Sequence, residues 1–347
     1  MYQPKPAIGA ELNLENRSEA SLVSLGFNLD KPLITLIIPV YNTYFYLEKC
    51  IRSITSQNFD RYEVVLIDDG STDGSSQLCD DLACDNPKIR VFHQKNSGVS
   101  SARNAGIELA LGDYLWFCDS DDSILDGSLS ILAHSIEQPR PAMVAFPVVK
   151  VDSKGNAIGR IPAPLPSNCS TLGPLQCNDE LYPFGRIIRR DVVGGERFNT
   201  SLSLLEDRDF LYRVWWRAAG NVEVLSQPLY RYLVTREDSA VNSASVTQYI
   251  DATSVQISIL EHELLHNNVM PAFELFAGFA IHTLSLIAQQ GECGNDYYSI
   301  RNELKEYSRY VSHLHGGLKP KYLLVLFCPA LFNAMAYLKE RLKELSC

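Results

Sequence analysis

Three aspartates within four residues, Asp119, Asp121 and Asp122, directly follow the apolar run YLWFC (114–118). Carboxylates this close repel one another, and removing them from water is costly unless a positive partner is present. Asp119 and Asp121 lie two positions apart, so a turn can aim both at one divalent cation. Carboxylate oxygens, together with the oxygens of a diphosphate, suit Mg²⁺ or Mn²⁺. The stretch therefore predicts a metal site that holds a phosphorylated ligand.

Other polar and aromatic residues in the first third of the chain suit a nucleotide. Tyr41 offers an aromatic face on which a base can stack, and Asp69 can accept a hydrogen bond from a base N–H or a ribose hydroxyl. The segment 96–98, Asn-Ser-Gly, opens a predicted helix whose free N–H groups favour phosphate, and Arg103 lies one turn inside that helix.

Short β-rich runs alternate with helical stretches from Leu33 onward, which predicts a mostly parallel sheet covered by helices on both faces. In such a sheet the ligand binds beyond the carboxyl ends of the strands, and that is where Tyr41, Asp69 and Asp119 fall. The predicted strands are 33–40, 62–68, 89–94, 114–118 and 142–151, and the predicted helices are 45–57, 74–85, 99–110, 126–137 and 204–220.

Each cluster also has a simpler interpretation. A single Asp-x-Asp is usually a solvated turn, and DDGSTDGS (68–75) can be a turn followed by a helix cap. Three such clusters at successive strand ends of one sheet favour a binding site.

The combination of these segments resembles the inverting glycosyltransferases of family 2, which have the GT-A fold. The resemblance covers about three fifths of the chain, roughly residues 33 to 240, with its motifs in order. The segments that carry it are ITLIIPVYN (34–42), VVLIDDGSTDGS (64–75), NSGVSSARNAGIELALGDYLWFCDSDD (96–122) and LLEDRDF (204–210).

The resemblance implies roles for individual residues. It implies that Asp119 and Asp121 chelate the cation on the sugar diphosphate. It also implies that Asp207 is the catalytic base, with Glu206 beside it. The candidate nucleotide-binding residues, by strand-end position or by resemblance, are Pro39, Tyr41, Asn42, Asp69, Asn96, Gly98, Arg103 and Ser120.

The segment around Glu206 and Asp207 is less specific when taken alone, because acids in the first turn of a helix are favoured by the helix dipole. The segment 185–199 resembles the part of the family that shapes the acceptor side. One departure follows: Leu233 stands where the family often has an arginine, and either Arg231 or Arg236 is the candidate replacement.

A second pattern, His262-Glu263-Leu264-Leu265-His266, satisfies HExxH, which is typical of zinc peptidases. The continuation offers no third ligand at the required spacing. Ile257, Leu260 and Leu264 form the apolar side of the predicted helix. The two histidines therefore fall on a face that we interpret as solvated, and a zinc peptidase is the weaker alternative.

Beyond residue 240 the pattern predicts helices at 244–267, 272–290, 296–311 and 321–345. The last contains an apolar stretch of about fifteen residues, interrupted by Pro329 and too short to cross a bilayer. Basic residues flank it on both sides. It is either a buried helix or an interfacial segment (319–345) that contacts anionic lipid, as would suit a lipid-linked acceptor.

Composition and net charge limit which other classes of protein this chain can belong to. The formal net charge of −10 over 347 residues argues against nonspecific nucleic-acid binding. Nine cysteines without a CxxC pair, and a start without a basic and apolar leader, predict a cytoplasmic protein, with peripheral contact at the inner membrane face as a hypothesis. We expect an N-terminal extension (1–30), a GT-A catalytic domain (31–240) and a C-terminal helical region (241–347).

The sequence thus predicts a metal-dependent inverting glycosyltransferase, transferring a hexosyl or N-acetylhexosaminyl group. The donor is a nucleotide-diphosphate sugar, with UDP expected, and the acceptor is a hydroxyl of a glycan or lipid-linked molecule in surface polysaccharide synthesis. A nucleotidyltransferase should have a Gly-rich basic loop after its first strand, and 39–50 has no glycine. A non-catalytic nucleotide-sugar binder would lack Glu206 and Asp207.

Overall fold

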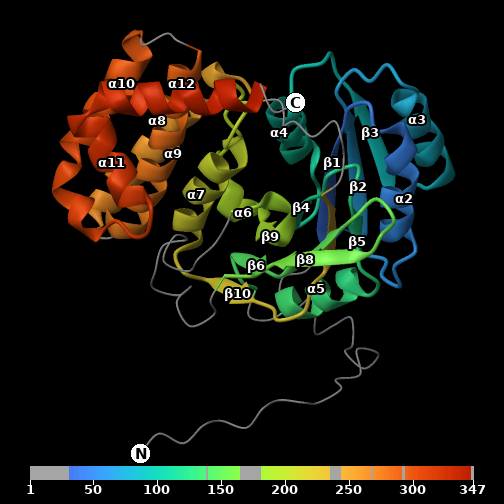
Figure 1. Ribbon diagram of the computed structural model, residues 1–347. Helices are drawn as coiled ribbons and strands as arrows, with labels where there is room; N and C mark the ends of the chain where they lie inside the picture. Colours follow the sequence, from blue (N-terminus) through green and yellow to red (C-terminus); the bar gives the residue numbers. More distant parts are fainter. Residues whose placement is uncertain are drawn as a thin grey trace, which may run out of the picture.

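A computed structural model describes residues 31–137, 140–164, 181–234, 244–266, 269–290 and 294–344. The expected extension (1–30) lies outside the described residues, as does residue 240, so the predicted domain boundaries stay predictions. Figure 1 shows an α/β part on one side and a group of helices on the other.

The main sheet of the α/β part has the strand order β10-β6-β9-β4-β1-β2-β3. The neighbours of β1 on both sides run parallel to it, and β9 is the antiparallel strand, lying between β4 and β6. The predicted mostly parallel sheet is confirmed. Its strands are β1 (Ile34–Val40), β2 (Tyr62–Asp68), β3 (Ile89–His93), β4 (Tyr114–Phe117), β6 (Met143–Ala145), β9 (Arg186–Arg189) and β10 (Val222–Val224).

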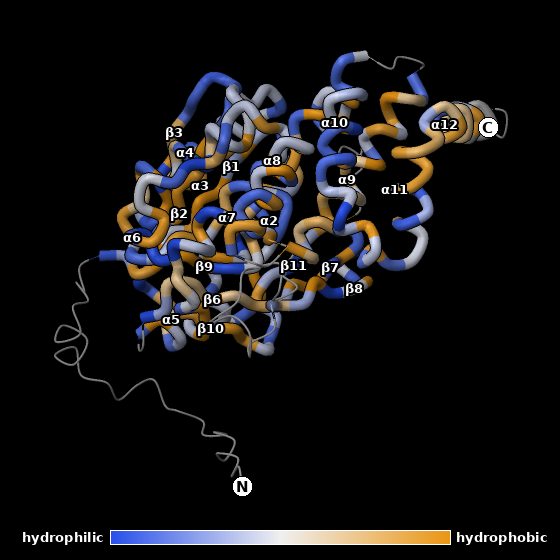
Figure 2. The backbone as a smooth tube through the Cα atoms, turned by 90° about the vertical axis from the view of Figure 1, so that its left-hand side faces the viewer, coloured by the Kyte–Doolittle hydropathy of each residue, from blue (hydrophilic) through white to orange (hydrophobic). Residues whose placement is uncertain are grey.

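Helices cover both faces of this sheet, because alternate strand residues are apolar on each side. One face packs against α2 (Tyr44–Thr55), α3 (Ser75–Asp85) and α5 (Ser128–Glu137), and the other against α4 (Val99–Leu109), α6 (Arg190–Val193) and α7 (Glu206–Ala218). Figure 2 shows hydrophobic residues along the central strands, such as β2, whereas β9 begins and ends with arginine. Helix α4 lies so close to β1 that a Cβ on Gly106 would be 2.2 Å from Ile37 Cγ2, so this position requires glycine.

A second, smaller sheet has the order β5-β11-β7-β8. Its strands are β5 (Ser123–Ile124), β7 (Val148–Val151), β8 (Ala157–Ile161) and β11 (Tyr230–Leu233). The prediction of one strand over 142–151 was wrong: this stretch is β6 in the main sheet followed by β7 in the second sheet. Pro147 separates them, because its nitrogen has no hydrogen to donate to a strand ladder.

The C-terminal part is helical, as predicted. It comprises α8 (Val246–Leu265), α9 (Val269–Gln289), α10 (Asn295–Glu306), a 3₁₀ helix (Ser308–His313), α11 (Leu318–Phe327) and α12 (Pro329–Glu344). The predicted helix over 321–345 is therefore two helices, which meet at Pro329 with a bend of 119°.

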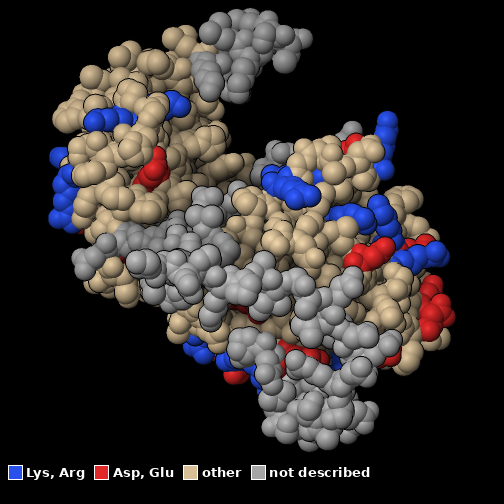
Figure 3. Space-filling model, turned by 90° about the horizontal axis from the view of Figure 1, so that it is seen from below, with Lys and Arg blue, Asp and Glu red and all other residues tan. Residues whose placement is uncertain are grey.

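Within the described residues, α9 is long and apolar enough to cross a membrane, and the bent pair of α11 and α12 passes the same test together. Half of the apolar window of α9 is buried in the protein, and Phe273, Phe276 and Leu284 belong to the core that also contains α7. This helix is the centre of the helical part. In Figure 3 the visible surface of that part, on the left, is mostly uncharged.

Candidate active site

A cavity of about 550 Å³ opens at the carboxyl ends of β1, β2 and β4. It gathers all the predicted site residues except Asn42 and Asp207, so segments that are far apart in the sequence meet here. Its lining is Pro39, Val40, Tyr41, Thr43, Asp69, Asn96, Gly98, Val99, Ala102, Arg103, Asp119, Ser120, Asp121, Glu206, Tyr232 and Leu233. We call it the strand-end cavity.

Tyr41 and Asp69 differ in how available they are to a ligand. Tyr41 is 47% exposed, so its ring is open to stacking. Asp69 is buried, and its carboxylate accepts hydrogen bonds from the backbone N–H groups of Ser97 and Gly98, each at 2.8 Å, and from Gln94. Asp69 therefore fixes the loop that leads into α4 as well as lining the cavity.

Asn42 has a different position from the one predicted. Its φ of 51° lies in the left-handed region, and its side-chain oxygen accepts from the backbone N–H of Thr72 at 2.8 Å. Its own N–H donates to the Ser71 hydroxyl. Asn42 thus ties the loop after β1 to the loop after β2 and does not line the cavity.

The positive partner of Asp119 is Arg103. One guanidinium nitrogen lies 3.2 Å from Asp119 Oδ1 and another lies 3.3 Å from Glu206 Oε1. The arginine side chain is only 7% exposed. Burial disfavours its charge, but Asp119 and Glu206 outweigh that effect and raise the pKa of Arg103. Its Nε is buried and has no hydrogen-bond partner among the described residues.

The third aspartate of the cluster, Asp122, is buried away from the cavity. Tyr230 donates its hydroxyl to Asp122 Oδ2 at 2.8 Å, and the Leu233 N–H donates to Oδ1 at 2.7 Å. Burial, together with the nearby Asp119 and Asp121, raises the pKa of Asp122 well above its usual range. The Tyr230 oxygen also accepts from the Asp119 N–H. Asp122 therefore holds the Asp-x-Asp turn against β11.

Asp119 and Asp121 supply carboxylate oxygens, which suit a hard cation, but two carboxylates alone do not complete its coordination. Both line the strand-end cavity, and the Asp119 side chain is 31% exposed. Among the described residues no group of three or more His, Cys, Asp or Glu side chains is placed to hold a metal. Mg²⁺ or Mn²⁺ would therefore bind through these two carboxylates only with oxygens from a phosphorylated ligand, the common arrangement for Mg²⁺.

Glu206 and Asp207 begin α7 after Leu205, which has a φ of 62°. Glu206 lines the cavity and is held by Arg103, whereas Asp207 is not among the lining residues. Burial, reinforced by repulsion from Glu206 and opposed by Arg103, raises the pKa of Asp207 to about 6. A carboxylate with this pKa is a better proton acceptor than one paired with arginine.

Tyr232 and Leu233 of β11 also line the cavity. Sequence analysis noted Leu233 only as a departure from an expected arginine and did not single out Tyr232, because their strand comes from the second sheet. Of the two candidate replacements, Arg231 is exposed and does not line the cavity, and Arg236 lies outside the described residues. Among the described residues, the arginine in the lining is Arg103.

The HExxH segment at the end of α8 is solvated only in part: His266 is exposed, as predicted, whereas His262 is partly buried. Glu263 is fully buried and accepts the Tyr212 hydroxyl at 2.6 Å, and that hydroxyl also contacts His262 Nδ1 at 2.9 Å. His266 stacks on Trp216, with ring centres 4.7 Å apart. His262, Glu263 and His266 thus join α8 to α7 through Tyr212 and Trp216. The sequence of α8 alone cannot reveal these partners, because they lie on another helix.

The strand-end cavity lies at the carboxyl ends of the parallel strands, the place where sheets of this kind bind their ligands. Residues 35–196 match the family model described as "Glycosyl transferase family 2". Residues 35–196 therefore form a family 2 glycosyltransferase domain, as the sequence predicted.

Curated relatives agree with this assignment over part of their length. The chain is 30% identical over 213 residues to the uncharacterized glycosyltransferase EpsJ of Bacillus subtilis, which covers 58% of this chain and 61% of EpsJ. It is 37% identical over 107 residues to the glycosyltransferase GlyG of Streptococcus pneumoniae, covering 30% of this chain and 36% of GlyG. The matches thus span less than two thirds of either relative.

A solved structure matches most of the fold. TarS 1–349 of S. aureus in complex with UDP-GlcNAc superposes with a TM-score of 0.64 over 88% of this chain and 89% of that one, at 20% identity. The complex of the same protein with UDP gives a TM-score of 0.62. The likeness includes the C-terminal helices and confirms the predicted GT-A fold with a helical region.

Proposed function

We propose that this protein is an inverting glycosyltransferase that moves a hexosyl or N-acetylhexosaminyl group from a UDP-sugar to a hydroxyl of a glycan or lipid-linked acceptor in surface polysaccharide synthesis. The observation that carries the proposal is the strand-end cavity, in which Tyr41, Asp69, Arg103, Asp119 and Glu206 meet. The UDP and UDP-GlcNAc complexes of TarS, whose fold this chain shares, support the choice of nucleotide.

The residues that line the cavity have different roles in the proposed reaction. Tyr41 stacks on the base, and the loop fixed by Asp69 presents the start of α4 to the phosphates. Arg103, with its buried Nε, adds positive charge beside them. A cation bound by Asp119 and Asp121 would neutralise charge on the diphosphate as it departs.

Asp207 is the proposed base. It takes the proton of the acceptor hydroxyl while that oxygen bonds to the anomeric carbon, and the bond from this carbon to the diphosphate breaks with its electron pair. In-line displacement places the nucleophile opposite the leaving group. Asp207 directly follows Glu206, which lines the donor cavity, so the proposed base lies next to the cavity and outside its lining.

The experiment that tests the function is a thermal-shift panel of UDP-, GDP- and dTDP-sugars with Mn²⁺, followed by product analysis on each ligand that binds. A UDP-sugar should stabilise the protein by about 2.7 kcal/mol at a hundredfold excess over its dissociation constant. Asp121→Ala should abolish this Mn²⁺-dependent shift, whereas Asp126→Ala, an exposed acid outside the cavity, should keep it. An unchanged shift in Asp121→Ala would refute the metal site, and no response to any donor would refute the function.

The proposal extends to a peripheral contact with the inner face of the membrane through α11 and α12. Phe327, Leu331, Met335 and Leu338 are each more than half exposed. The last three fall on one side of α12, because they recur at helical spacing, and Phe332 and Ala336 on its other side are buried. Basic residues flank the pair in sequence, which suits anionic lipid.

A further inference from the structure

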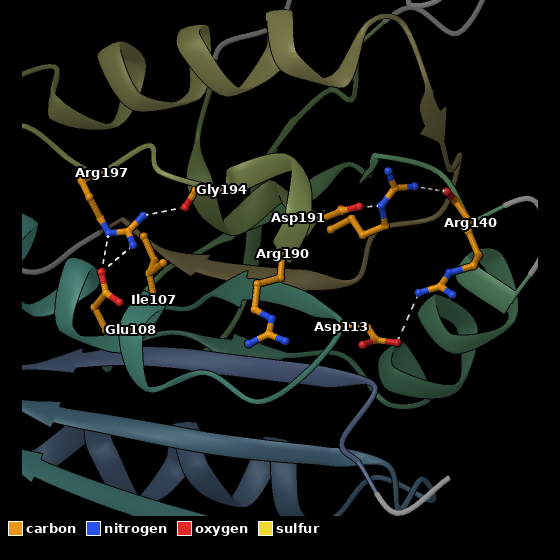
Figure 4. A pocket seen from close by; sticks show the side chains of 9 residues that line it. Ile107, Glu108, Asp113, Arg140, Arg190, Asp191, Gly194 and Arg197 are labelled. Carbon is orange, nitrogen blue, oxygen red and sulfur yellow. Dashed lines mark hydrogen bonds and ion pairs between the residues drawn. The ribbon is translucent and has the colours of Figure 1, made fainter. Parts of the chain in front are cut away.

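A second cavity, of about 440 Å³, lies at the other end of α4 from the strand-end cavity. Four arginines and three acids dominate its lining, which is Ile107, Glu108, Asp113, Arg140, Arg189, Arg190, Asp191, Gly194 and Arg197. We call it the arginine cavity. Figure 4 shows its side chains from close by.

The two cavities are separated by the length of one helix and one strand. Gly98 and Arg103, at the start of α4, line the strand-end cavity, and Ile107 and Glu108, in its last turn, line the arginine cavity. An eleven-residue helix is about 16 Å long. Asp113 likewise precedes β4, whereas Asp119 follows it. The arginine cavity therefore belongs to the opposite edge of the sheet, and its ligand is not the donor.

Three of the four arginines are held in place by the three acids. Each of these guanidinium groups is anchored by one carboxylate and is fixed at the wall. The pairs are Arg140 with Asp113 at 3.3 Å, Arg189 with Asp191 at 2.6 Å, and Arg197 with Glu108.

Arg190 is the exception. No carboxylate pairs with it among the described residues; one of its terminal nitrogens donates to the carbonyl of Ala110 at 3.0 Å. In Figure 4 its guanidinium lies between Glu108 and Asp113, and no dashed line joins it to the other residues drawn. A guanidinium group carries five N–H donors in a planar fork, so most of those of Arg190 remain for a ligand.

We propose that the arginine cavity binds a phosphorylated saccharide or polyol, with the phosphate on Arg190. The guanidinium fork matches two phosphate oxygens, and arginine is preferred for such pairs. The volume exceeds that of a bare phosphate and falls in the range of small-molecule sites. Glu108, Asp113 and Asp191 offer carboxylate oxygens that accept from sugar hydroxyls. Four arginines against three acids leave a net positive charge in a chain whose net charge is −10.

The test is calorimetric titration of the full chain with glucose 1-phosphate, inorganic phosphate and glucose. Glucose 1-phosphate should bind more tightly than phosphate, and glucose should not bind detectably. Arg190→Gln should weaken glucose 1-phosphate at least tenfold, and Arg190→Lys should weaken it less. Arg231→Gln, which removes an exposed arginine outside both cavities, is the matched control and should bind as the parent does.

The parent titration decides the proposal even if the Arg190 variants do not fold. Absence of glucose 1-phosphate binding, or equal binding of glucose, overturns it. Retained affinity in a folded Arg190→Gln variant overturns it as well. The UDP affinity of Arg190→Gln should equal that of the parent, since a parallel loss of UDP and glucose 1-phosphate binding would place the ligand in the strand-end cavity instead. This outcome does not depend on whether glycosyl transfer is observed.

Discussion

Arg103 is the residue around which the acids of the strand-end cavity are arranged. Its guanidinium contacts Asp119 after β4 and Glu206 at the start of α7, and its charge also lowers the pKa of Asp207 against the effect of burial. Removing one member of a buried ionic group leaves the others uncompensated. A single side chain thus sets the electrostatics of both the proposed metal ligands and the proposed base.

Arg103→Met should lower the free energy of unfolding by about 3 kcal/mol, since two partly buried carboxylates lose their buried partner. It should also weaken UDP binding at least tenfold. Arg103→Lys keeps the charge but cannot contact Asp119 and Glu206 with separate nitrogens, so intermediate values are expected. Denaturant unfolding and UDP titration measure both effects, and a Met variant as stable as the parent would contradict this account.

Asp207→Asn should reduce transfer by roughly a hundredfold or more, the usual scale for a lost general base, with little change in donor affinity. Because the pKa of Asp207 is raised to about 6, the parent's rate should fall as the pH drops through that value. The pH–rate profile and the UDP-sugar affinity are the measurements.

Glu206→Gln is the matched control for Asp207→Asn, with a smaller expected loss of rate. If Glu206→Gln is inactive while Asp207→Asn stays active, Glu206 is the base and Asp207 is not.

The dependence of stability on pH tests the raised pKa of Asp207 independently of catalysis. The raised pKa of Asp207 favours folding below pH 3.8, its ordinary value, and this contribution is lost as the pH rises through about 6. Asp207→Asn should therefore have the higher melting temperature at pH 7.5, and the difference should shrink below pH 4.

At the scale of elements, β11 closes the strand-end cavity from the second sheet. Tyr230 bonds to both Asp122 and the backbone of Asp119, so β11 positions the Asp-x-Asp turn at the end of β4. Tyr232 and Leu233 then continue as the wall. The metal ligands proposed on one strand depend on hydrogen bonds from another sheet.

Tyr230→Phe should lower stability by about 1–3 kcal/mol, because it leaves the buried Asp122 carboxylate with one fewer donor. Mn²⁺-dependent UDP-sugar binding should weaken too, as the turn loses its support. Asp122→Asn is the informative companion, since its amide can still accept from Leu233 and donate to the Tyr230 oxygen. It should remain close to the parent in melting temperature and in donor affinity, and a loss equal to that of Tyr230→Phe would count against this geometry.

Most elements could be predicted from periodicity alone, and each element or contact that was missed has an identifiable physical cause. The strand ends carrying Tyr41, Asp69 and Asp119 followed from alternating apolar runs. The break at Pro147, between two sheets, was hidden inside one apolar run. The ion pair of Arg103 with Glu206 and the burial of Glu263 depend on partners 103 and 51 residues away, which a pattern in one segment cannot specify.

At the scale of the whole molecule, the helical part presents the exposed apolar side of α12. Leu331→Glu with Met335→Glu should reduce the fraction of protein sedimenting with anionic liposomes several-fold, because both side chains lie outside the core and would carry charge into the interface. Leu265→Glu, at a side chain 82% exposed on α8, is the matched control. Equal sedimentation of all three proteins would refute the membrane contact.

The hydrogen bonds to Asp122 have a consequence for the order in which the molecule is made. The donors, Tyr230 and Leu233, lie 108 and 111 residues further along the chain. Closing so long a loop costs conformational entropy, and contacts of this separation form slowly. Synthesis delivers the N-terminal strands first, so β1 to β4 can pair while the acidic turn still lacks its support. A nascent chain would therefore complete the proposed sugar-nucleotide site only after residue 233 has left the ribosome.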